Sequence, residues 1–356
     1  MQMTAKAVGV VGASGYTGAE LLRLLDAHAM LSLEAVTAAS MAGRQIADVY
    51  PSLGVAYGDR TFEAGLIDDD PTALAERLDG LDAVFLGLPH EAAMHLVPHL
   101  MDRVGHIVDL SAAFRLKDAT AYPEFYGFEH TETDLLAGAV YGLPELHRKE
   151  LLGAQLIATP GCHVTAATLA LAPLVHAGVV EPRGLIVDSM TGITGAGRAP
   201  TDTNIFANID ANTVAYGLHH HRHTPEMEQE IGGRVLFTPH LVPMSRGLLA
   251  TCHAPAADTD VRHADDIEAA ITAAYRDAYA DEPFVAVVDG PPSTKACLGA
   301  NTALVSASYD ARTGSVIAMA ALDNLTKGAS GGALQALNVA LGVEETAGLP
   351  TIGLQP

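Results

Sequence analysis

The chain has 356 residues, 49% of them hydrophobic, a length that suggests two domains with sizeable cores rather than one. Its formal net charge of −22 argues against a nucleic-acid partner, because a uniformly acidic surface repels phosphate backbones. The three widely spaced cysteines, Cys162, Cys252 and Cys297, do not form the pattern of a disulfide framework and favour a reducing compartment.

The amino-terminal residues lead straight into an apolar, strand-like run, with no basic segment followed by a long apolar one, so we expect no signal peptide. No stretch approaches the roughly 18 apolar residues that a membrane-spanning helix needs. We therefore expect a soluble, cytoplasmic protein with no membrane partner. A phosphate-bearing small substrate is compatible with the acidity, because local arginines and helix N-termini can outweigh the global field.

The first half of the chain alternates between short apolar runs and helical stripes. The pattern predicts strands at 7–11, 33–38, 81–88 and 106–110 and helices at 19–28 and 91–100. This alternation is typical of an α/β fold with a Rossmann-type, doubly wound parallel sheet. Residues 122–146 are rich in Tyr, Phe, Gly and Pro, and we expect a long surface loop there.

In the second half, a strand at 155–159 and a helix at 161–176 come before a run of closely spaced strand candidates. The pattern places these strands at 184–189, 234–241, 247–254, 284–288, 302–309 and 315–323, and further helices at 265–279 and 325–341. Few helices separate the strands, which predicts an α+β domain with a mixed, largely antiparallel sheet.

A glycine-rich loop follows the first predicted strand and opens the first helix. Glycines at this position let the backbone approach a pyrophosphate, which sits on the helix N-terminus. The expected contacts are Gly12, Ser14, Gly15, Tyr16, Thr17 and Gly18. A glycine-rich turn without a ligand is the alternative.

The end of the second strand bears on the choice of cofactor. It carries no carboxylate for the ribose hydroxyls of NAD, but Ser40 and Arg44 follow it, which favours the 2′-phosphate of NADP(H). The alternative for Arg44 is an ordinary surface charge.

Cys162 lies between a predicted strand and a long predicted helix. A thiol at a helix N-terminus is placed to ionise, and the thiolate is the nucleophile in acyl transfer. A buried structural cysteine is the alternative, and it fits Cys252 and Cys297 better because both lie in or beside apolar strands.

Four histidines and an arginine occupy positions 219–223, before a helix that Thr224 is expected to cap. One interpretation is a general acid/base partner for a nucleophile. A second is a metal site, since His219, His221 and His223 share a face if extended, although no cysteine or carboxylate completes a zinc set. The third is a group of surface histidines.

A second glycine-rich loop, 191–198, contains hydroxyls, free amides and Arg198. Such a loop makes a cradle for an oxyanion or phosphate, and Thr194 and Gly195 are its expected contacts. Arg115 and Arg246 are further candidate anion ligands. The alternatives are a flexible turn for the loop and exposed or salt-bridged charges for the arginines.

In chain order, these motifs resemble those of the N-acetyl-γ-glutamyl-phosphate reductases of arginine biosynthesis, over essentially the whole length. The matching stretches are GASGYTGAELLRLL, GLPH, DLSAAFRL, YPEFYGFEH, YGLPEL, TPGC, DSMTGITGAGRAP, HRHTPEMEQ, FTPHLVPMSRG and DNLTKGASGGALQALN. Aspartate-semialdehyde dehydrogenases share the general plan but not HRHTPE or GLPEL.

The resemblance implies an NADP-binding Rossmann domain over 1–155, completed by the carboxyl-terminal segment 325–356. It implies a catalytic and oligomerisation domain over 156–324, in a homo-oligomer that is a dimer or a tetramer. The implied reaction is NADPH-dependent reduction of N-acetyl-L-glutamyl 5-phosphate to the 5-semialdehyde and phosphate, through a thioester on Cys162.

The resemblance also implies roles for individual residues. It makes His221 the acid/base group, with His223 second, gives Glu226 an orienting role, and requires no metal. It further implies cofactor contacts at Pro89, Ser111, Gly195, Asn324 and Lys327.

Three departures from the family pattern concern the fine geometry of substrate binding. The family often has Asp where this chain has Ala113, Lys where it has Met190, and an aromatic residue then Pro where it has His163 and Val164. The alternatives are therefore an aspartate-semialdehyde dehydrogenase, a lysine-pathway reductase of a carrier-linked acyl phosphate, a non-catalytic NADP-sensing regulator, and a zinc protein built on the histidines.

Overall fold

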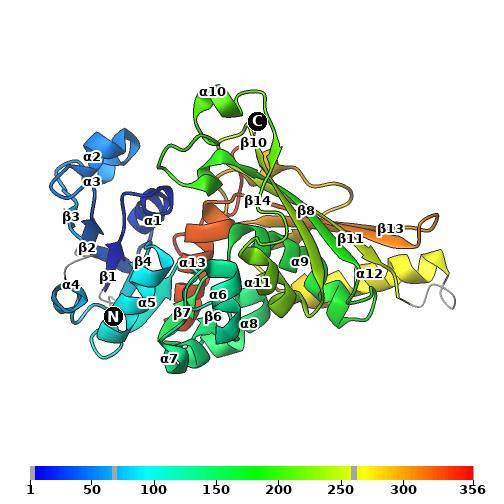
Figure 1. The fold of residues 1–356 in the computed structure, drawn as a ribbon, viewed down its shortest axis with the longest axis horizontal. Helices are drawn as coiled ribbons and strands as arrows, with labels where there is room; N and C mark the ends of the chain where they lie inside the picture. Colours follow the sequence, from blue (N-terminus) through cyan, green and yellow to red (C-terminus); the bar gives the residue numbers. More distant parts are fainter. Residues whose placement is uncertain (1–4, 66–69, 258–262, 356) are drawn as a thin grey trace. The chain divides into compact units, whose positions relative to one another are not determined.

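The computed structural model describes residues 5–65, 70–257 and 263–355 (Figure 1). The chain forms two compact units. Unit 1 comprises Met1–Pro123, Gly127–Pro160 and Ala329–Leu349, and unit 2 comprises Glu124–Tyr126, Gly161–Gly328 and Pro350–Pro356. The outermost parts of the predicted domain ranges, residues 1–4 and 356, lie outside the described residues, as do 66–69 and 258–262.

Unit 1 is built on a sheet of seven parallel strands in the order β3-β2-β1-β4-β5-β7-β6. The strands are β1 (Lys6–Val11), β2 (Leu31–Ala38), β3 (Glu63–Ala64), β4 (Ala83–Leu86), β5 (His106–Asp109), β6 (Val140–Tyr141) and β7 (Leu156–Ala158). The strand order reverses between β1 and β4, and this is the switch point at which ligands bind in open α/β sheets. The predicted Rossmann-type parallel sheet is confirmed.

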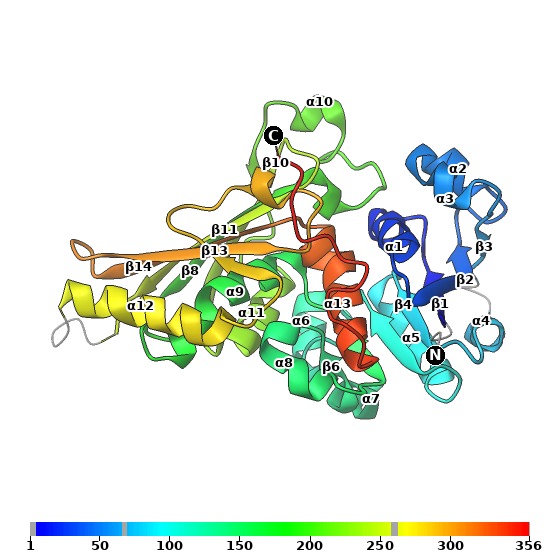
Figure 2. The ribbon, with the colours of Figure 1, turned by 180° about the vertical axis from the view of Figure 1, so that it is seen from behind.

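The helices of unit 1 connect these strands (Figures 1 and 2). They are α1 (Tyr16–Asp26), α2 (Ile46–Val49), α3 (Gly54–Tyr57), α4 (Pro71–Arg77), α5 (His90–Leu100), α7 (Thr133–Gly138), α8 (Pro144–Leu151) and α13 (Gly331–Ala340). The late helix α13 packs against α1, α8 and β5. The single helix predicted over 325–341 is instead a π-helix, Thr326–Ser330, followed by α13.

The prediction of a long loop over 122–146 is wrong. The segment contains α6 (Tyr122–Tyr126), α7, β6 and the start of α8. Pro123 and Pro144 lie in the first turns of α6 and α8, where a missing N–H costs nothing. The prolines that suggested a loop therefore mark helix starts, and β6 adds a short parallel strand beside β7.

Unit 2 contains a second sheet of seven strands in the order β12-β13-β14-β11-β8-β10-β9. The strands are β8 (Leu185–Gly192), β9 (Val214–Ala215), β10 (Val235–Val242), β11 (Leu248–Pro255), β12 (Val285–Val287), β13 (Ala303–Asp310) and β14 (Ser315–Leu322). The pairs β8–β10 and β12–β13 are parallel and the other four are antiparallel, so the predicted mixed sheet is confirmed.

Helix α9 (Cys162–His176) packs on this sheet together with α11 (His223–Ile231) and α12 (Ala264–Tyr279), while α10 (Phe206–Ile209) is a short separate helix. Pro173 inside α9 has no N–H to donate to the carbonyl of Leu169. The hydroxyl of Tyr279, on α12, donates to that carbonyl at 2.6 Å, and the hydroxyl of Tyr275 donates to the next one. These contacts hold α9 in place and so position Cys162 at its start.

Candidate active site

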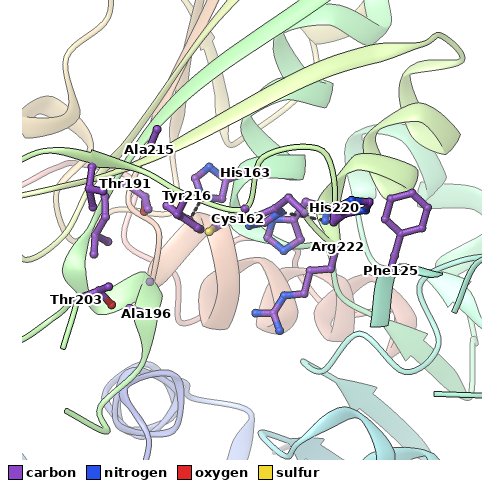
Figure 3. Close-up of a pocket in the computed structure, with 16 residues that line it drawn as sticks. Phe125, Cys162, His163, Thr191, Ala196, Thr203, Ala215, Tyr216, His220 and Arg222 are labelled. Atoms are coloured by element: carbon purple, nitrogen blue, oxygen red, sulfur yellow. Dashed lines mark hydrogen bonds between the residues drawn. The ribbon is translucent and has the colours of Figure 1, made fainter. Parts of the chain in front are cut away.

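A cavity of about 590 Å³ opens in unit 2 at the N-terminus of α9 (Figure 3). Its walls come from the start of α9, the end of β8, the turn after β8, the strand β9 and the segment that leads into α11. The lining residues are Phe125, Cys162, His163, Thr191, Gly195, Ala196, Thr203, Val214, Ala215, Tyr216, Gly217, His220, His221, Arg222, His223 and Leu241.

Cys162 is the first residue of α9, after the N-cap Gly161, and its side chain is partly exposed. The helix dipole and the free amides of the first turn favour a thiolate at this position. Cys252 and Cys297 are buried, and burial raises the pKa of both, that of Cys297 to about 11. Among the described residues, Cys162 is therefore the cysteine placed to act as a nucleophile.

Two contacts fix the backbone just before Cys162. The carboxylate of Glu226, fully buried on α11, accepts a hydrogen bond from the N–H of Gly161 at 3.0 Å. The ring of His223 packs so closely on Gly161 that a Cβ there would lie 2.2 Å from Nε2. Only glycine fits at 161, and Glu226 and His223 lie where they position the nucleophile.

The ring of His221 is oriented by the backbone of α11. Its Nδ1 accepts a hydrogen bond from the N–H of His223 at 3.1 Å, so the neutral ring carries its proton on Nε2. Burial and the positive charge of Arg222 lower the pKa of His221 to about 4. At neutral pH, His221 is therefore a neutral donor, with no lone pair on Nε2 to accept a proton.

Three residues that the sequence analysis did not assign to the site form a chain beside Cys162. His163 places Nδ1 at 2.7 Å from the hydroxyl of Ser189, on β8, and Nε2 at 3.1 Å from the hydroxyl of Tyr216. Tyr216 reaches this position because its N–H donates to Pro239 on β10. Only the departure at 163 signalled this chain in the sequence, and nothing local pointed to Tyr216.

The second glycine-rich loop is tied to two other segments of unit 2. The side chain of Asn324 accepts from the N–H of Gly247 at 2.8 Å and donates to the hydroxyl of Thr194 at 2.9 Å. That hydroxyl donates to the carbonyl of Ser245 at 2.7 Å. Thr194 and Asn324 therefore hold the loop that brings Gly195 to the cavity wall, and their roles as direct ligands stay predictions.

The predicted anion ligands of unit 2 lie apart from the cavity lining. Arg198 and Arg246 are not among the lining residues, and Arg246 lies 3.4 Å from the buried carboxylate of Asp323. Lys327 is buried, with its Nζ 5.8 Å from the centre of the Phe284 ring. Among the described residues that line the cavity, Arg222 is the one arginine or lysine.

In unit 1, the glycine-rich loop follows β1 at the switch point of the sheet. Gly12 has a φ of +82°, and a Cβ there would lie 2.2 Å from the carbonyl oxygen of Gly87. Helix α1 begins after the N-cap Gly15, with no side-chain cap and no acidic residue in its first turn. This helix start, over Tyr16, Thr17 and Gly18, fits a pyrophosphate.

The other predicted cofactor and phosphate contacts of unit 1 lie after its strands. Ser40 and Arg44 are exposed after β2, and Pro89 is the N-cap of α5. Ser111 donates its hydroxyl to the buried carboxylate of Asp109 at 2.8 Å, and burial raises the pKa of that carboxyl to about 6. Arg115 is buried and donates to the carbonyl of Leu110 at 3.1 Å.

Within the described ranges, no group of three or more His, Cys, Asp or Glu side chains is arranged to hold a metal ion. None of the described helices has the length and apolar character needed to cross a membrane.

Comparison with known proteins places both halves of the chain. Residues 7–154 match the family model described as semialdehyde dehydrogenase, NAD binding domain, and 162–324 match semialdehyde dehydrogenase, dimerisation domain. The chain is 41% identical to an N-acetyl-gamma-glutamyl-phosphate reductase of Dehalococcoides mccartyi, over 98% of both chains. It is 42% identical to that of Pelotomaculum thermopropionicum, over 98% of this chain and 99% of the other.

Solved structures with the same fold include aspartate semialdehyde dehydrogenase II from Vibrio cholerae, with a TM-score of 0.66 and 16% identity. Aspartate semialdehyde dehydrogenase with NADP from Candida albicans gives a TM-score of 0.65 at 16% identity. Each alignment covers 94% of this chain and 98% of the other, and at this identity the likeness concerns the fold alone.

Proposed function

The chain belongs to the N-acetyl-gamma-glutamyl-phosphate reductase family, and we propose that it reduces N-acetyl-L-glutamyl 5-phosphate to N-acetyl-L-glutamate 5-semialdehyde and phosphate, a step of arginine biosynthesis. The observation that carries this proposal is the cavity at the start of α9, where Cys162 meets the Nε2–H donor His221 and the cation Arg222. A nucleophile, an oxyanion donor and an anion ligand are what acyl transfer from a phosphate requires.

In the first step, the thiolate of Cys162 attacks the acyl carbonyl carbon. A carbon–sulfur bond forms, the bond from that carbon to the phosphate oxygen breaks, and phosphate leaves with the electron pair. His221 donates Nε2–H to the carbonyl oxygen as negative charge develops on it. Glu226 acts from behind, by holding the backbone of Gly161 so that the thiolate and His221 stay aligned.

In the second step, the carbonyl carbon of the thioester accepts a hydride, which NADPH supplies when bound. The oxyanion that forms keeps its hydrogen bond to His221 until the carbon–sulfur bond breaks. Cys162 then leaves as the thiolate that began the cycle, the product is the aldehyde, and the proton of the overall reaction ends on the released phosphate. No side chain has to act as a base.

The substrate is anionic, and the cavity contains groups suited to hold it. Arg222 supplies a guanidinium, which pairs with carboxylate or phosphate in a fork geometry. The hydroxyl of Thr191 is buried in the wall and has no hydrogen-bond partner among the described residues, so a polar group of the substrate can satisfy it. We assign the substrate anion to Arg222 ahead of Arg198, Arg246 and Arg115.

Unit 1 supplies the NADP(H) site in this proposal. The helix start over residues 12–18 would hold the pyrophosphate, and Pro89 and Ser111 lie after neighbouring strands of the same sheet. Ser40 and Arg44 would hold the 2′-phosphate, because β2 ends at Ala38 without a carboxylate of its own. The three free cysteines suit the reducing cytoplasm in which we place the enzyme.

We further propose a homo-oligomer that pairs through unit 2. Helices α9, α11 and α12 pack on the sheet, but on the strands β8 and β10 alternate side chains remain exposed. Ile186, Met190 and Leu236 are 37%, 45% and 58% exposed, and Leu236 lies directly beside Ile186. Apolar side chains gathered on one face of a sheet are typical of an interface.

The first test is NADPH formation in the reverse direction, with N-acetyl-glutamate semialdehyde, NADP and phosphate as substrates. Aspartate semialdehyde serves as the parallel substrate, and Cys162→Ser serves as the inactive control. Phosphate-dependent turnover of the acetylated substrate, lost in Cys162→Ser, is the expected result. Turnover with aspartate semialdehyde alone would move the activity to the shorter substrate, and NADP binding without turnover would contradict the proposal.

A further inference from the structure

The chain of three residues beside Cys162 carries an inference about the chemistry of the cavity. Ser189 and His163 are buried, whereas Tyr216 lines the cavity, and Figure 3 shows Tyr216 and Cys162 beside the ring of His163. The two hydrogen bonds, Ser189 to His163 and His163 to Tyr216, run from the sheet to the cavity wall. The question is in which direction the protons point.

Counting protons answers it. Burial, together with the positive charges of His221 and Arg222, lowers the pKa of His163 to about 3, so its ring is neutral and carries one proton. Ser189, His163 and Tyr216 then hold one proton each for two hydrogen bonds, and one proton is left over. Either the hydroxyl of Ser189 or the hydroxyl of Tyr216 must point away from the chain.

Burial decides between the two. The hydroxyl of Ser189 is fully buried, and among the described residues it has no acceptor other than His163. A buried donor without an acceptor is costly, so Ser189 donates to Nδ1 of His163. The ring therefore carries its proton on Nε2 and donates to the oxygen of Tyr216. The hydroxyl proton of Tyr216 is left to point into the cavity.

We propose that Tyr216 is a further catalytic residue, whose hydroxyl donates a hydrogen bond to the oxygen of the acyl group on Cys162, and that Ser189 and His163 are positioning residues that fix this direction. The inference rests on the proposed acyl-phosphate reduction. Tyr216 forms no bond to the substrate and transfers no proton. It is the second donor to the oxyanion, beside the Nε2–H of His221.

The surroundings of Tyr216 suit a donor that keeps its proton. Its ring centre lies 5.5 Å from that of His221, so both donors belong to one wall of the cavity. Burial and the negative charge of a Cys162 thiolate raise the pKa of Tyr216 above its usual range. A neutral phenol next to a developing oxyanion stabilises it without reorganising, which is the basis of oxyanion-hole catalysis.

The test compares kcat in the phosphate-dependent reverse assay for wild type, Tyr216→Phe, Ser189→Ala and the double variant, with NADP affinity measured in parallel. Removing one oxyanion donor lowers kcat by roughly 100-fold or more, and we expect this for Tyr216→Phe with unchanged NADP affinity. We expect Ser189→Ala to lower kcat as well, because His163 then turns its lone pair to Tyr216. The double variant should be no slower than Tyr216→Phe.

Matched variants separate this role from simple packing. His163→Gln, which can accept from Ser189 and donate to Tyr216, should retain more activity than His163→Phe. Tyr57→Phe removes a hydroxyl that donates to the carbonyl of Leu22 in unit 1, and it should leave kcat unchanged. A kcat within twofold of wild type for Tyr216→Phe, or independent losses from Ser189→Ala and Tyr216→Phe in the double variant, would overturn the inference while leaving the reaction intact. A wild type without turnover would overturn both.

Discussion

Glu226 accepts a hydrogen bond at 3.0 Å from the backbone N–H of Gly161, the residue immediately before Cys162. The carboxylate is fully buried on α11, so a side chain that begins 65 residues further along the chain sets the position of the N-terminus of α9. Gly161 cannot move toward α11 either, because the ring of His223 already fills that space. The nucleophile is thus placed from two sides.

This contact predicts different effects for two substitutions of Glu226. Glu226→Gln keeps an acceptor for Gly161 and should retain most of the kcat. Glu226→Ala leaves the N–H of Gly161 buried without its partner, which costs about 1–3 kcal/mol of stability, and should lower kcat more than it changes KM. Urea unfolding and steady-state kinetics measure the two effects, and equal kinetics for the two variants would argue against a positioning role.

Arg222 is predicted to bind the anionic part of the substrate. Arg222→Leu should raise the KM for the semialdehyde or phosphate at least tenfold, because a charge-assisted hydrogen bond contributes roughly 1.5–3 kcal/mol. The same substitution removes a positive charge that lowers the pKa of His221, so that pKa should rise toward its usual value. Arg198→Leu, at a position outside the cavity lining, is the matched control, and a larger KM effect there would reassign the anion site.

Arg44 is predicted to select NADP over NAD. Arg44→Ala should weaken NADP binding by about tenfold, the scale of an exposed charge contact to phosphate, and leave NAD binding unchanged. Calorimetric titration with both cofactors measures the two affinities. Arg23→Ala, which removes a guanidinium paired with Glu20 on α1, is the control. Equal losses for NADP and NAD at Arg44 would place the 2′-phosphate elsewhere.

Leu236 lies at the centre of the apolar surface formed with Ile186 and Met190. Leu236→Lys puts a charge into that surface and should shift the protein toward monomers, because a buried unpaired charge is strongly unfavourable. Sedimentation velocity over a range of protein concentrations measures the shift. Val287→Lys changes another exposed apolar residue, on the edge strand β12, and should leave the assembly unchanged. A Leu236→Lys protein that assembles like wild type would exclude this face.

The fold class could be predicted because its signals are local. Short apolar runs, separated by helical stripes, gave both sheets to within a few residues at most strand ends. The loop predicted over 122–146 failed because Pro123 and Pro144 interrupt helices when internal but begin them when placed in the first turn. The same residue type carries opposite meanings, and the local sequence did not decide between them.

The site could be predicted only where chemistry-bearing residues are neighbours in the chain, as at Cys162 and in the segment 219–223. Ser189 belongs to a strand whose inward side depends on its pairing with β10 and β11. Tyr216 reaches the cavity only because β9 pairs with β10. Such register information is a tertiary property, and no motif in the sequence carries it.

The final prediction concerns pH and the buried ring of His163, whose pKa falls to about 3 in the folded protein. Between pH 6.5 and that value the unfolded chain binds a proton at this residue that the folded chain excludes. The stabilising contribution is therefore complete above pH 6.5 and is lost as the pH falls, at up to about 1.4 kcal/mol per pH unit. His163→Phe should flatten this slope in urea unfolding at pH 4.5, 5.5 and 6.5. His95→Phe, at an exposed histidine of α5, should keep the slope of wild type, and parallel slopes for wild type and His163→Phe would show that the ring is protonated in the fold.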